Sequence, residues 1–152
     1  MSNELKIDQA KTSDYYAIAV LLQETQLPPD GIEAHLENFL IIRKSETTAK
    51  SEKIVGSVGL EIYGKSALLR SLAVHPDYQG QGLGTRLVNK IIDFAKDRGI
   101  TRIFLLTDTA EDYFTRKGFV IVTRDKVPED MKQSIEFTTL CTSAPSMMRD
   151  IS

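Results

Sequence analysis

The sequence lacks the residues on which disulfide-linked, metal-binding and membrane-spanning proteins depend. Its 152 residues include one cysteine, Cys141, which cannot form an internal disulfide bond, and two histidines, so no metal site is expected. The apolar runs are a few residues long, and the first ten residues have acidic side chains and no apolar core. We therefore expect no membrane span and no secretory signal. These absences predict a small cytoplasmic protein that is a monomer or a homodimer.

A strong charge of either sign is missing as well. The formal net charge is −2, whereas broad contact with nucleic acid needs a clustered basic face, so we expect no nucleic-acid partner. The length suits one compact domain and not two. We predict a single domain over residues 1–152, with a core of about residues 4–141 and a C-terminal tail over 142–152.

Hydrophobic spacing predicts helices interleaved with strands, which is the pattern of a mixed α/β sheet. Strands are predicted around Leu5 and Ile7 and over residues 39–43, 54–63, 67–74, 102–106 and 119–123. Helices are predicted over 15–22, behind a cap at Thr12 or Ser13, and over 32–39, 83–95 and 110–117. The polar segment 44–53 is predicted to be an exposed hairpin loop.

The most informative segment is LAVHPDYQGQGLGTRLV, residues 72–88. A buried strand leads into a turn with three alternate glycines, Gly80, Gly82 and Gly84, and then directly into an amphipathic helix. Closely spaced glycines let backbone N–H groups face one point, and a helix N-terminus adds unpaired donors and the positive end of its dipole. The segment therefore predicts an anion site suited to a diphosphate.

Two nucleotide-binding motifs do not fit this turn. The P-loop needs Lys followed by Ser or Thr after its last glycine, whereas Gly84 is followed by Thr85 and Arg86. The dinucleotide fingerprint needs G-x-G-x-x-G, whereas the glycines here fall at alternate positions deep in the chain. An ordinary glycine-rich turn without a ligand stays open as the alternative.

The pattern Q-x-x-G-x-G from Gln79 to Gly84, preceded by Leu-Ala-Val-His-Pro, resembles the GNAT superfamily of acetyl-CoA-dependent acyltransferases. The order of elements agrees from the first strand to about residue 140. The resemblance implies a central mixed, mostly antiparallel sheet flanked by helices, an N-acetyltransferase activity, acetyl-CoA as cosubstrate and no metal. It also implies which residues contact acetyl-CoA through pantetheine, acetyl or diphosphate: Leu72, Ala73, Val74, Gln79, Gly80, Gln81, Gly82, Leu83, Gly84 and Thr85.

The resemblance implies further roles near the chemistry, with one departure. The backbone amide of Val74 polarises the thioester carbonyl. Many members donate the last proton from a tyrosine four residues before a Gly-Phe pair, but AEDYFTRKGF has Phe114 there and Tyr113 one residue earlier. The usual asparagine is Thr107, and Thr107 and Phe114 are expected to line the cofactor site. Tyr113 or water donates the proton, or no acid is needed; plain packing is the alternative role of Tyr113.

The base is sought by strand geometry. If Gly64 and Lys65 form a two-residue turn, Glu61, Tyr63 and Arg70 share one face of the hairpin, beside Gly59, which leaves space. We predict that all three contact substrate, that Glu61 is a general base acting through water, and that Arg70 anchors a substrate carboxylate. The alternative is a Glu61–Arg70 cross-strand ion pair, and a one-residue slip of register would separate the two groups.

Two stretches narrow the resemblance: GLEIYGKSALLRSLAVHPDYQGQGLG, and LLTDTAEDYFTRKGF followed by VPEDMKQSIEFTTLCTSAP. They resemble the small acetyltransferases of arsenic-resistance operons and, more distantly, the acetyltransferase domain of N-acetylglutamate synthase. This implies a small, amino-acid-like amine as acceptor, with direct transfer in a ternary complex. One cysteine cannot supply the several thiolates that trivalent arsenic prefers. A non-catalytic acyl-CoA sensor, prompted by Phe114, and a protein N-acetyltransferase stay open as alternatives.

Overall fold

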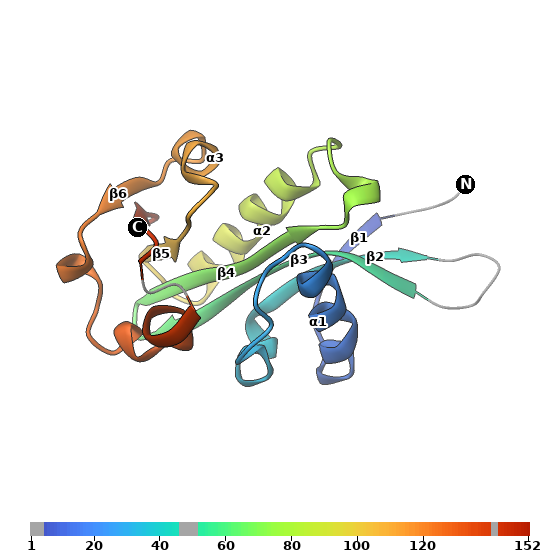
Figure 1. Cartoon of the computed structure of the whole chain (residues 1–152), viewed down its shortest axis with the longest axis horizontal. Coiled ribbons are helices and arrows are strands. Elements are labelled where there is room, and N and C mark those ends of the chain that lie inside the picture. The colour runs from blue at the N-terminus through green and yellow to red at the C-terminus, as the bar shows by residue number, and fades with distance from the viewer. Residues whose placement is uncertain (1–4, 46–51, 141–142) are drawn as a thin grey trace. The chain divides into compact units, whose positions relative to one another are not determined.

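The fold is described from a computed structural model over residues 5–45, 52–140 and 143–152. Most of the predicted loop 44–53 and Cys141 lie outside this part of the chain. The helices and strands, labelled in Figure 1, are β1 (Leu5–Gln9), α1 (Tyr15–Glu24), β2 (Phe39–Ser45), β3 (Glu52–Tyr63), β4 (Ser66–Val74), α2 (Leu83–Asp97), β5 (Arg102–Leu106), α3 (Glu111–Arg116), β6 (Val120–Val122) and β7 (Ser146–Asp150).

The seven strands in the described residues form one sheet in the order β1-β2-β3-β4-β5-β7-β6. β4 and β5 run parallel, whereas β1 with β2, β2 with β3, β5 with β7 and β6 with β7 run antiparallel. The predicted mixed, mostly antiparallel sheet with flanking helices is confirmed. The chain divides into two compact units, the first made of Met1–Leu60 and Ser71–Ile91 and the second of Glu61–Arg70 and Ile92–Ser152.

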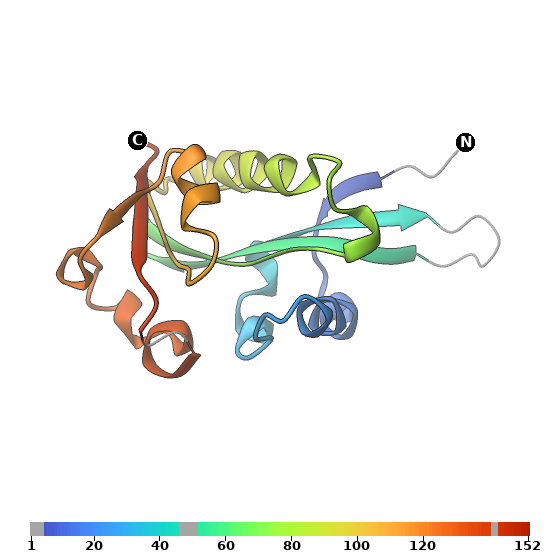
Figure 2. The ribbon, with the colours of Figure 1, turned by 45° about the horizontal axis from the view of Figure 1, so that its top comes forward.

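The first unit places helices on both faces of its strands. Figure 2 shows α1 and the segment after it on one face of β2 and β3, and the first turns of α2 on the other. The predicted helix over 32–39 is wrong, because the segment forms two 3-10 turns, Ile32–Ala34 and Leu36–Asn38. Its apolar residues still join α1 in one core cluster with β2: Ile18, Leu21, Leu22, Ile32, Leu36, Phe39 and Ile41.

The cap predicted for α1 is also wrong. Thr12 and Ser13 belong to a 3-10 turn, Thr12–Asp14, and Asp14 holds the N-cap position without a side-chain bond to the helix. The carboxylate of Asp14 instead accepts hydrogen bonds from the Lys11 N–H, at 2.8 Å, and from Arg43, at 2.6 and 3.1 Å. The ion pair with β2 therefore replaces the cap as the anchor of this helix end.

The second unit contains a strand, β7, in the segment predicted to be a C-terminal tail. β7, the red strand in Figure 2, lies between β5 and β6, with Phe104 and Val120 both opposite Met148. Met147 is fully buried. The prediction that residues 142–152 lie outside the core is therefore wrong for Ser146–Asp150, because β5 and β6 would otherwise each leave an unpaired edge.

The space predicted beside Gly59 is filled by a neighbouring strand. Phe39 of β2 pairs with Gly59 of β3, and its fully buried ring lies where a Cβ of residue 59 would stand. Gly59 is therefore a packing position for an aromatic ring of the core, and the expectation of open space for a substrate there is wrong.

We predict that Gly59→Ala destabilises the protein by about 1–3 kcal/mol, because the added methyl group overlaps the Phe39 ring in a closed core. Gly56→Ala is the matched control on the same strand. There the nearest atom is the flexible Cδ1 end of Ile42, at 2.9 Å, so a smaller loss is expected. Urea unfolding measures both variants, and an equal or smaller loss for Gly59→Ala would contradict the packing described.

Candidate active site

The glycine turn lies in the first unit, between the end of β4 and the start of α2. The backbone N–H of His75 donates to the Val55 carbonyl at 2.8 Å, and a 3-10 turn, Pro76–Tyr78, follows. Gln79 Nε2 donates to the Val74 carbonyl at 2.9 Å, which ties the turn to the end of the strand. The first helical bond runs from the Arg86 N–H to the Gly82 carbonyl, at 3.1 Å.

Two glycines give this turn its shape. Gly80 and Gly82 have φ values of +82° and +79°, and no atom lies within 4 Å of the place where either Cβ would stand. The bare backbone leads into the first turn of α2, whose leading N–H groups have no acceptor inside the helix. A diphosphate bound by backbone amides fits these residues, because both the space and the donors are present. The turn thus suits the diphosphate that the sequence predicted there.

A strained residue interrupts β4 just before Leu72. Ser71 has a φ of +62°, a left-handed conformation that costs a residue with a side chain about 1–2 kcal/mol. The Ser57 hydroxyl donates to the Ser71 carbonyl at 2.7 Å and holds this conformation. Beyond it, Leu72 and Val74 are half-buried and Ala73 is buried. Nothing in the local sequence predicted Ser57 and Ser71, because no glycine or proline marks the irregularity.

The second unit contains a buried polar group that we call the carboxylate cluster, made of Glu61, Tyr63, Arg70 and Glu136. Arg70 Nη1 lies 2.9 Å from Glu61 Oε2, and the Tyr63 hydroxyl donates to Glu61 Oε1 at 2.6 Å. Arg70 Nη2 lies 3.6 Å from Glu136 Oε2. The side chains of Arg70, Glu61 and Glu136 are 0%, 2% and 9% exposed. Water therefore screens these charges weakly.

The cluster brings together three residues that the hairpin geometry predicted. Gly64 and Lys65 form the turn between β3 and β4, which keeps Glu61, Tyr63 and Arg70 in contact. The cross-strand ion pair is confirmed, although it is buried and not solvated. The anchoring of a substrate carboxylate by Arg70 stays a prediction. The Glu61 and Glu136 carboxylates already lie at the guanidinium, which makes this role less favourable.

Glu136 was missed by the sequence analysis. It begins a π-helical turn, Glu136–Leu140, and its backbone N–H donates to Ser134 Oγ at 3.1 Å. No local pattern links it to a hairpin more than sixty residues earlier in the chain. Burial raises the pKa of Glu136 above its ordinary value, Arg70 opposes the shift and the Glu61 charge adds to it. Burial and the hydrogen bond to Glu61 likewise raise the pKa of Tyr63.

The predicted acid region lies around α3, also in the second unit. Thr107 Oγ1 accepts a hydrogen bond from the Ala110 N–H at 3.0 Å, at the start of the helix. Phe114 is buried, with its ring 5.2 Å from that of Tyr113 and 5.6 Å from that of Phe119. The Tyr113 hydroxyl is buried and has no hydrogen-bond partner among the residues that the structure describes. A buried phenol normally has a partner, so the role of Tyr113, as proton donor or as plain packing, stays a prediction.

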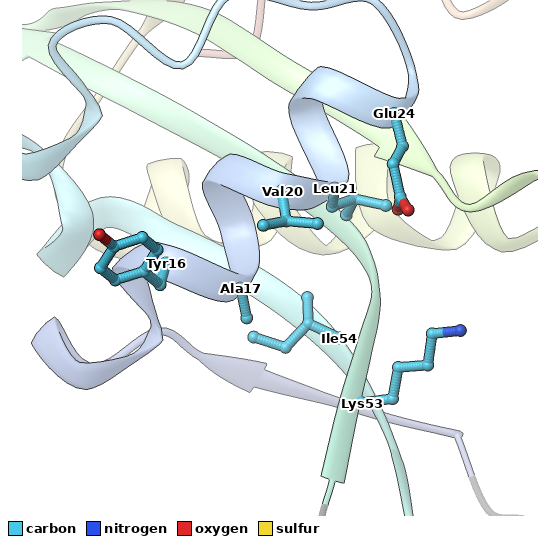
Figure 3. Close-up of a pocket in the computed structure, with 7 residues that line it drawn as sticks. All are labelled: Tyr16, Ala17, Val20, Leu21, Glu24, Lys53 and Ile54. Carbon is cyan, nitrogen blue, oxygen red and sulfur yellow. The ribbon is translucent and has the colours of Figure 1, made fainter.

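A groove in the first unit shares no residue with the features above. Figure 3 shows it between α1 and the start of β3, with Glu24 and Lys53 near one end. Tyr16 and Val20 of its lining are 80% and 48% exposed. Within the described ranges, no group of three or more metal-ligating side chains is found, and no helix is both long and apolar enough to cross a membrane.

The model of the acetyltransferase (GNAT) family matches residues 9–119, which include the glycine turn, most of the carboxylate cluster and α3. The chain belongs to the GNAT acetyltransferase family. The predicted family and the N-acetyltransferase class are confirmed. The resemblance to acetyltransferases of arsenic-resistance operons stays a prediction.

Curated relatives carry the name amino-acid acetyltransferase. The protein of Escherichia coli K12 is 30% identical over 106 residues, which are 68% of this chain and 23% of the relative. That of Neisseria meningitidis serogroup A is 30% identical over 136 residues, 85% of this chain and 30% of the relative. The chain thus spans about a quarter to a third of the length of these relatives.

Solved structures agree in fold. N-acetylglutamate synthase from Neisseria gonorrhoeae, complexed with coenzyme A and N-acetyl-glutamate, is 25% identical with a TM-score of 0.80, covering 100% of this chain and 36% of that one. A GNAT-family acetyltransferase from Staphylococcus aureus is 18% identical with a TM-score of 0.74, covering 98% and 100%. The Neisseria structure supports coenzyme A as a ligand of this fold.

We predict that Arg70→Met destabilises the protein by about 3–5 kcal/mol near neutral pH, because it leaves two buried carboxylates without their cation. Without Arg70, burial disfavours the ionised form of both carboxyl groups, so we expect their pKa values to lie above those of the unfolded chain. The protonated, stable form is then present at low pH and is lost as pH rises. The loss of stability caused by Arg70→Met, which we call the deficit, should therefore become smaller as the pH is lowered.

Urea unfolding at several pH values measures this deficit. The control is the triple variant Glu61→Gln, Arg70→Met, Glu136→Gln, which removes the charges together and should recover part of the loss at neutral pH. A deficit that stays constant with pH, or a triple variant as unstable as Arg70→Met, would contradict the cluster.

Proposed function

We propose that this protein is an acetyl-CoA-dependent N-acetyltransferase that acts on a small, amino-acid-like amine. The glycine turn carries the proposal: Gly80 and Gly82 expose bare backbone immediately before the N-terminus of α2, within the segment matched by the family. The names of the relatives and the coenzyme A and N-acetyl-glutamate bound to the Neisseria structure support the cosubstrate and the acceptor class.

The binding residues we propose are mainly backbone groups. The N–H groups from Gln79 to Thr85 hold the diphosphate, and the strand residues Leu72 to Val74 pair with the pantetheine arm. Gln79 keeps the turn against the end of β4 through its bond to the Val74 carbonyl. The bound cosubstrate supplies an acetyl group activated as a thioester.

Proton movement is assigned to two side chains. An amine must lose a proton before it attacks, and Glu61 takes this proton through water, while Arg70 and Tyr63 hold its carboxylate in place. The Val74 N–H polarises the carbonyl as the new C–N bond forms. The C–S bond then breaks, and the buried Tyr113 hydroxyl donates a proton to the leaving sulfur. Transfer is direct, within a ternary complex.

The acceptor is proposed at the level of its chemistry. Amino acids and amine-bearing organoarsenicals both fit the resemblance stated above, so both belong in a substrate panel, and the protein is proposed to work in the cytoplasm. Binding of acetyl-CoA without turnover on any amine would instead identify an acyl-CoA sensor. Turnover on peptides alone would identify a protein N-acetyltransferase.

We predict that Glu61→Gln lowers kcat about 10²- to 10⁴-fold, because the amide cannot accept the proton of the amine. The affinity for acetyl-CoA should be retained. The measurement is acetylated product by mass spectrometry, with Glu129→Gln as control, since Glu129 is an exposed glutamate paired with Lys132. If Glu61→Gln turns over at the rate of the unmodified protein, Glu61 is not the base.

We predict that Gly82→Ala raises the Kd for acetyl-CoA about tenfold or more, because a side chain then stands over the backbone donors. Gly64→Ala is the matched control for Gly82→Ala. Gly64 also has a positive φ, +64°, with nothing within 4 Å, but it lies in the hairpin turn. Calorimetric titration should show an unchanged Kd for Gly64→Ala, and equal effects of the two substitutions would remove the glycine turn as the binding site.

A further inference from the structure

Two carboxylates reach the guanidinium of Arg70 from different parts of the second unit. Glu61 lies on β3, with Oε2 2.9 Å from Nη1, and Glu136 lies on the π-helical turn, with Oε2 3.6 Å from Nη2. When both carboxyl groups are ionised, one cation faces two anions. Their side chains are at most 9% exposed, so water screens the charge of one carboxylate only weakly from the other.

The two carboxyl groups are unequally supported. Glu61 has the shorter contact with Arg70 and also accepts the Tyr63 hydroxyl at 2.6 Å. Glu136 has the longer contact, and burial together with the Glu61 charge raises its pKa, against the opposing effect of Arg70. The negative charge of Glu61 is thus the better supported of the two, and Glu136 is the carboxyl group whose pKa is raised.

The segment 124–132 of the same unit adds further charged groups, each with contacts of its own. Asp130, at the start of the turn Met131–Gln133, acts on Tyr63 through its charge. Arg124 lies 5.1 Å from the ring of Phe137, the residue after Glu136, and donates to the Ala144 carbonyl at 2.7 Å. Lys132 is paired with Glu129 at 2.9 Å.

We propose that Glu136 is a positioning residue that sets, through Arg70, the strength of Glu61 as a proton acceptor. An ionised Glu136 attracts the guanidinium and repels the negative charge of Glu61, so Glu61 binds a proton more tightly. A protonated Glu136 competes less with Glu61 for the guanidinium, and Glu61 is then the weaker base. The inference rests on the proposed role of Glu61, and it adds a second carboxyl group whose ionisation strengthens that base.

The first test is the pH dependence of kcat for the full chain. The unmodified protein should show a second rise in kcat as Glu136 loses its proton. In Glu136→Gln this rise should be absent, with kcat about threefold lower on the alkaline side and an unchanged KM for acetyl-CoA. The matched control is Glu129→Gln. The Glu129 side chain is 88% exposed and pairs with Lys132, so this variant should show the pH profile of the unmodified protein.

The second test needs no activity. NMR of protein labelled with carbon-13 in its glutamate carboxyl groups follows each titration directly. The Glu136 signal, identified by its loss in Glu136→Gln, should titrate above the ordinary range of glutamate. The Glu61 signal, identified by its loss in Glu61→Gln, should shift in the same step. Glu136→Asp identifies the first signal equally well if the glutamine variant does not fold.

The proposal is overturned if Glu136→Gln keeps the pH profile of the unmodified protein, or if the two NMR signals titrate independently. Failure of the proposed function looks different. If no amine is acetylated, or if Glu61→Gln retains turnover, the role of Glu61 as base is lost, while the NMR titrations still decide whether Glu136 and Glu61 are coupled through Arg70.

Discussion

The pairing of the buried Arg70 guanidinium with Glu61 and Glu136 constrains how the second unit folds. Burying a cation without its partners costs several kcal/mol of stability. The backbone must therefore bring both carboxylates to the guanidinium. The hairpin turn at Gly64 and Lys65 delivers Glu61, and the π-helical turn delivers Glu136. Phe137, next along the chain, packs with Leu68 in the apolar cluster of the same unit.

This constraint also fixes the register of the hairpin. A shift by one residue would turn Glu61 and Arg70 to opposite faces and bury each without a partner. The same contacts hold the Glu61 carboxylate rigidly, as its proposed role as a proton acceptor requires. In the first unit the same demand for a fixed geometry is met differently, by the strained Ser71 and by glycines with positive φ. An anion site built from backbone amides needs no lysines, in keeping with a net charge of −2.

The features that the sequence predicts well are those that depend on neighbouring residues in the chain. Alternate glycines before a helix marked the turn, and a two-residue gap between apolar runs marked the hairpin that joins Glu61 to Arg70. Features that depend on distant partners were missed. Ser-Met-Met-Arg-Asp has no alternation, so β7 emerges only when β5 and β6 are placed beside it. Phe39 at Gly59 and Glu136 at Arg70 likewise depend on contacts between segments far apart in the chain.

The proposed function requires that this chain bind acetyl-CoA through its glycine turn and pass the acetyl group directly to an amine. The most direct measurement is the release of coenzyme A thiol from acetyl-CoA by the purified protein, with and without a panel of amino acids and other small amines. We expect thiol release that requires an added amine and equals the acetylated product formed. Thiol release that is independent of the amine, or none with any amine despite tight binding of acetyl-CoA, would contradict it.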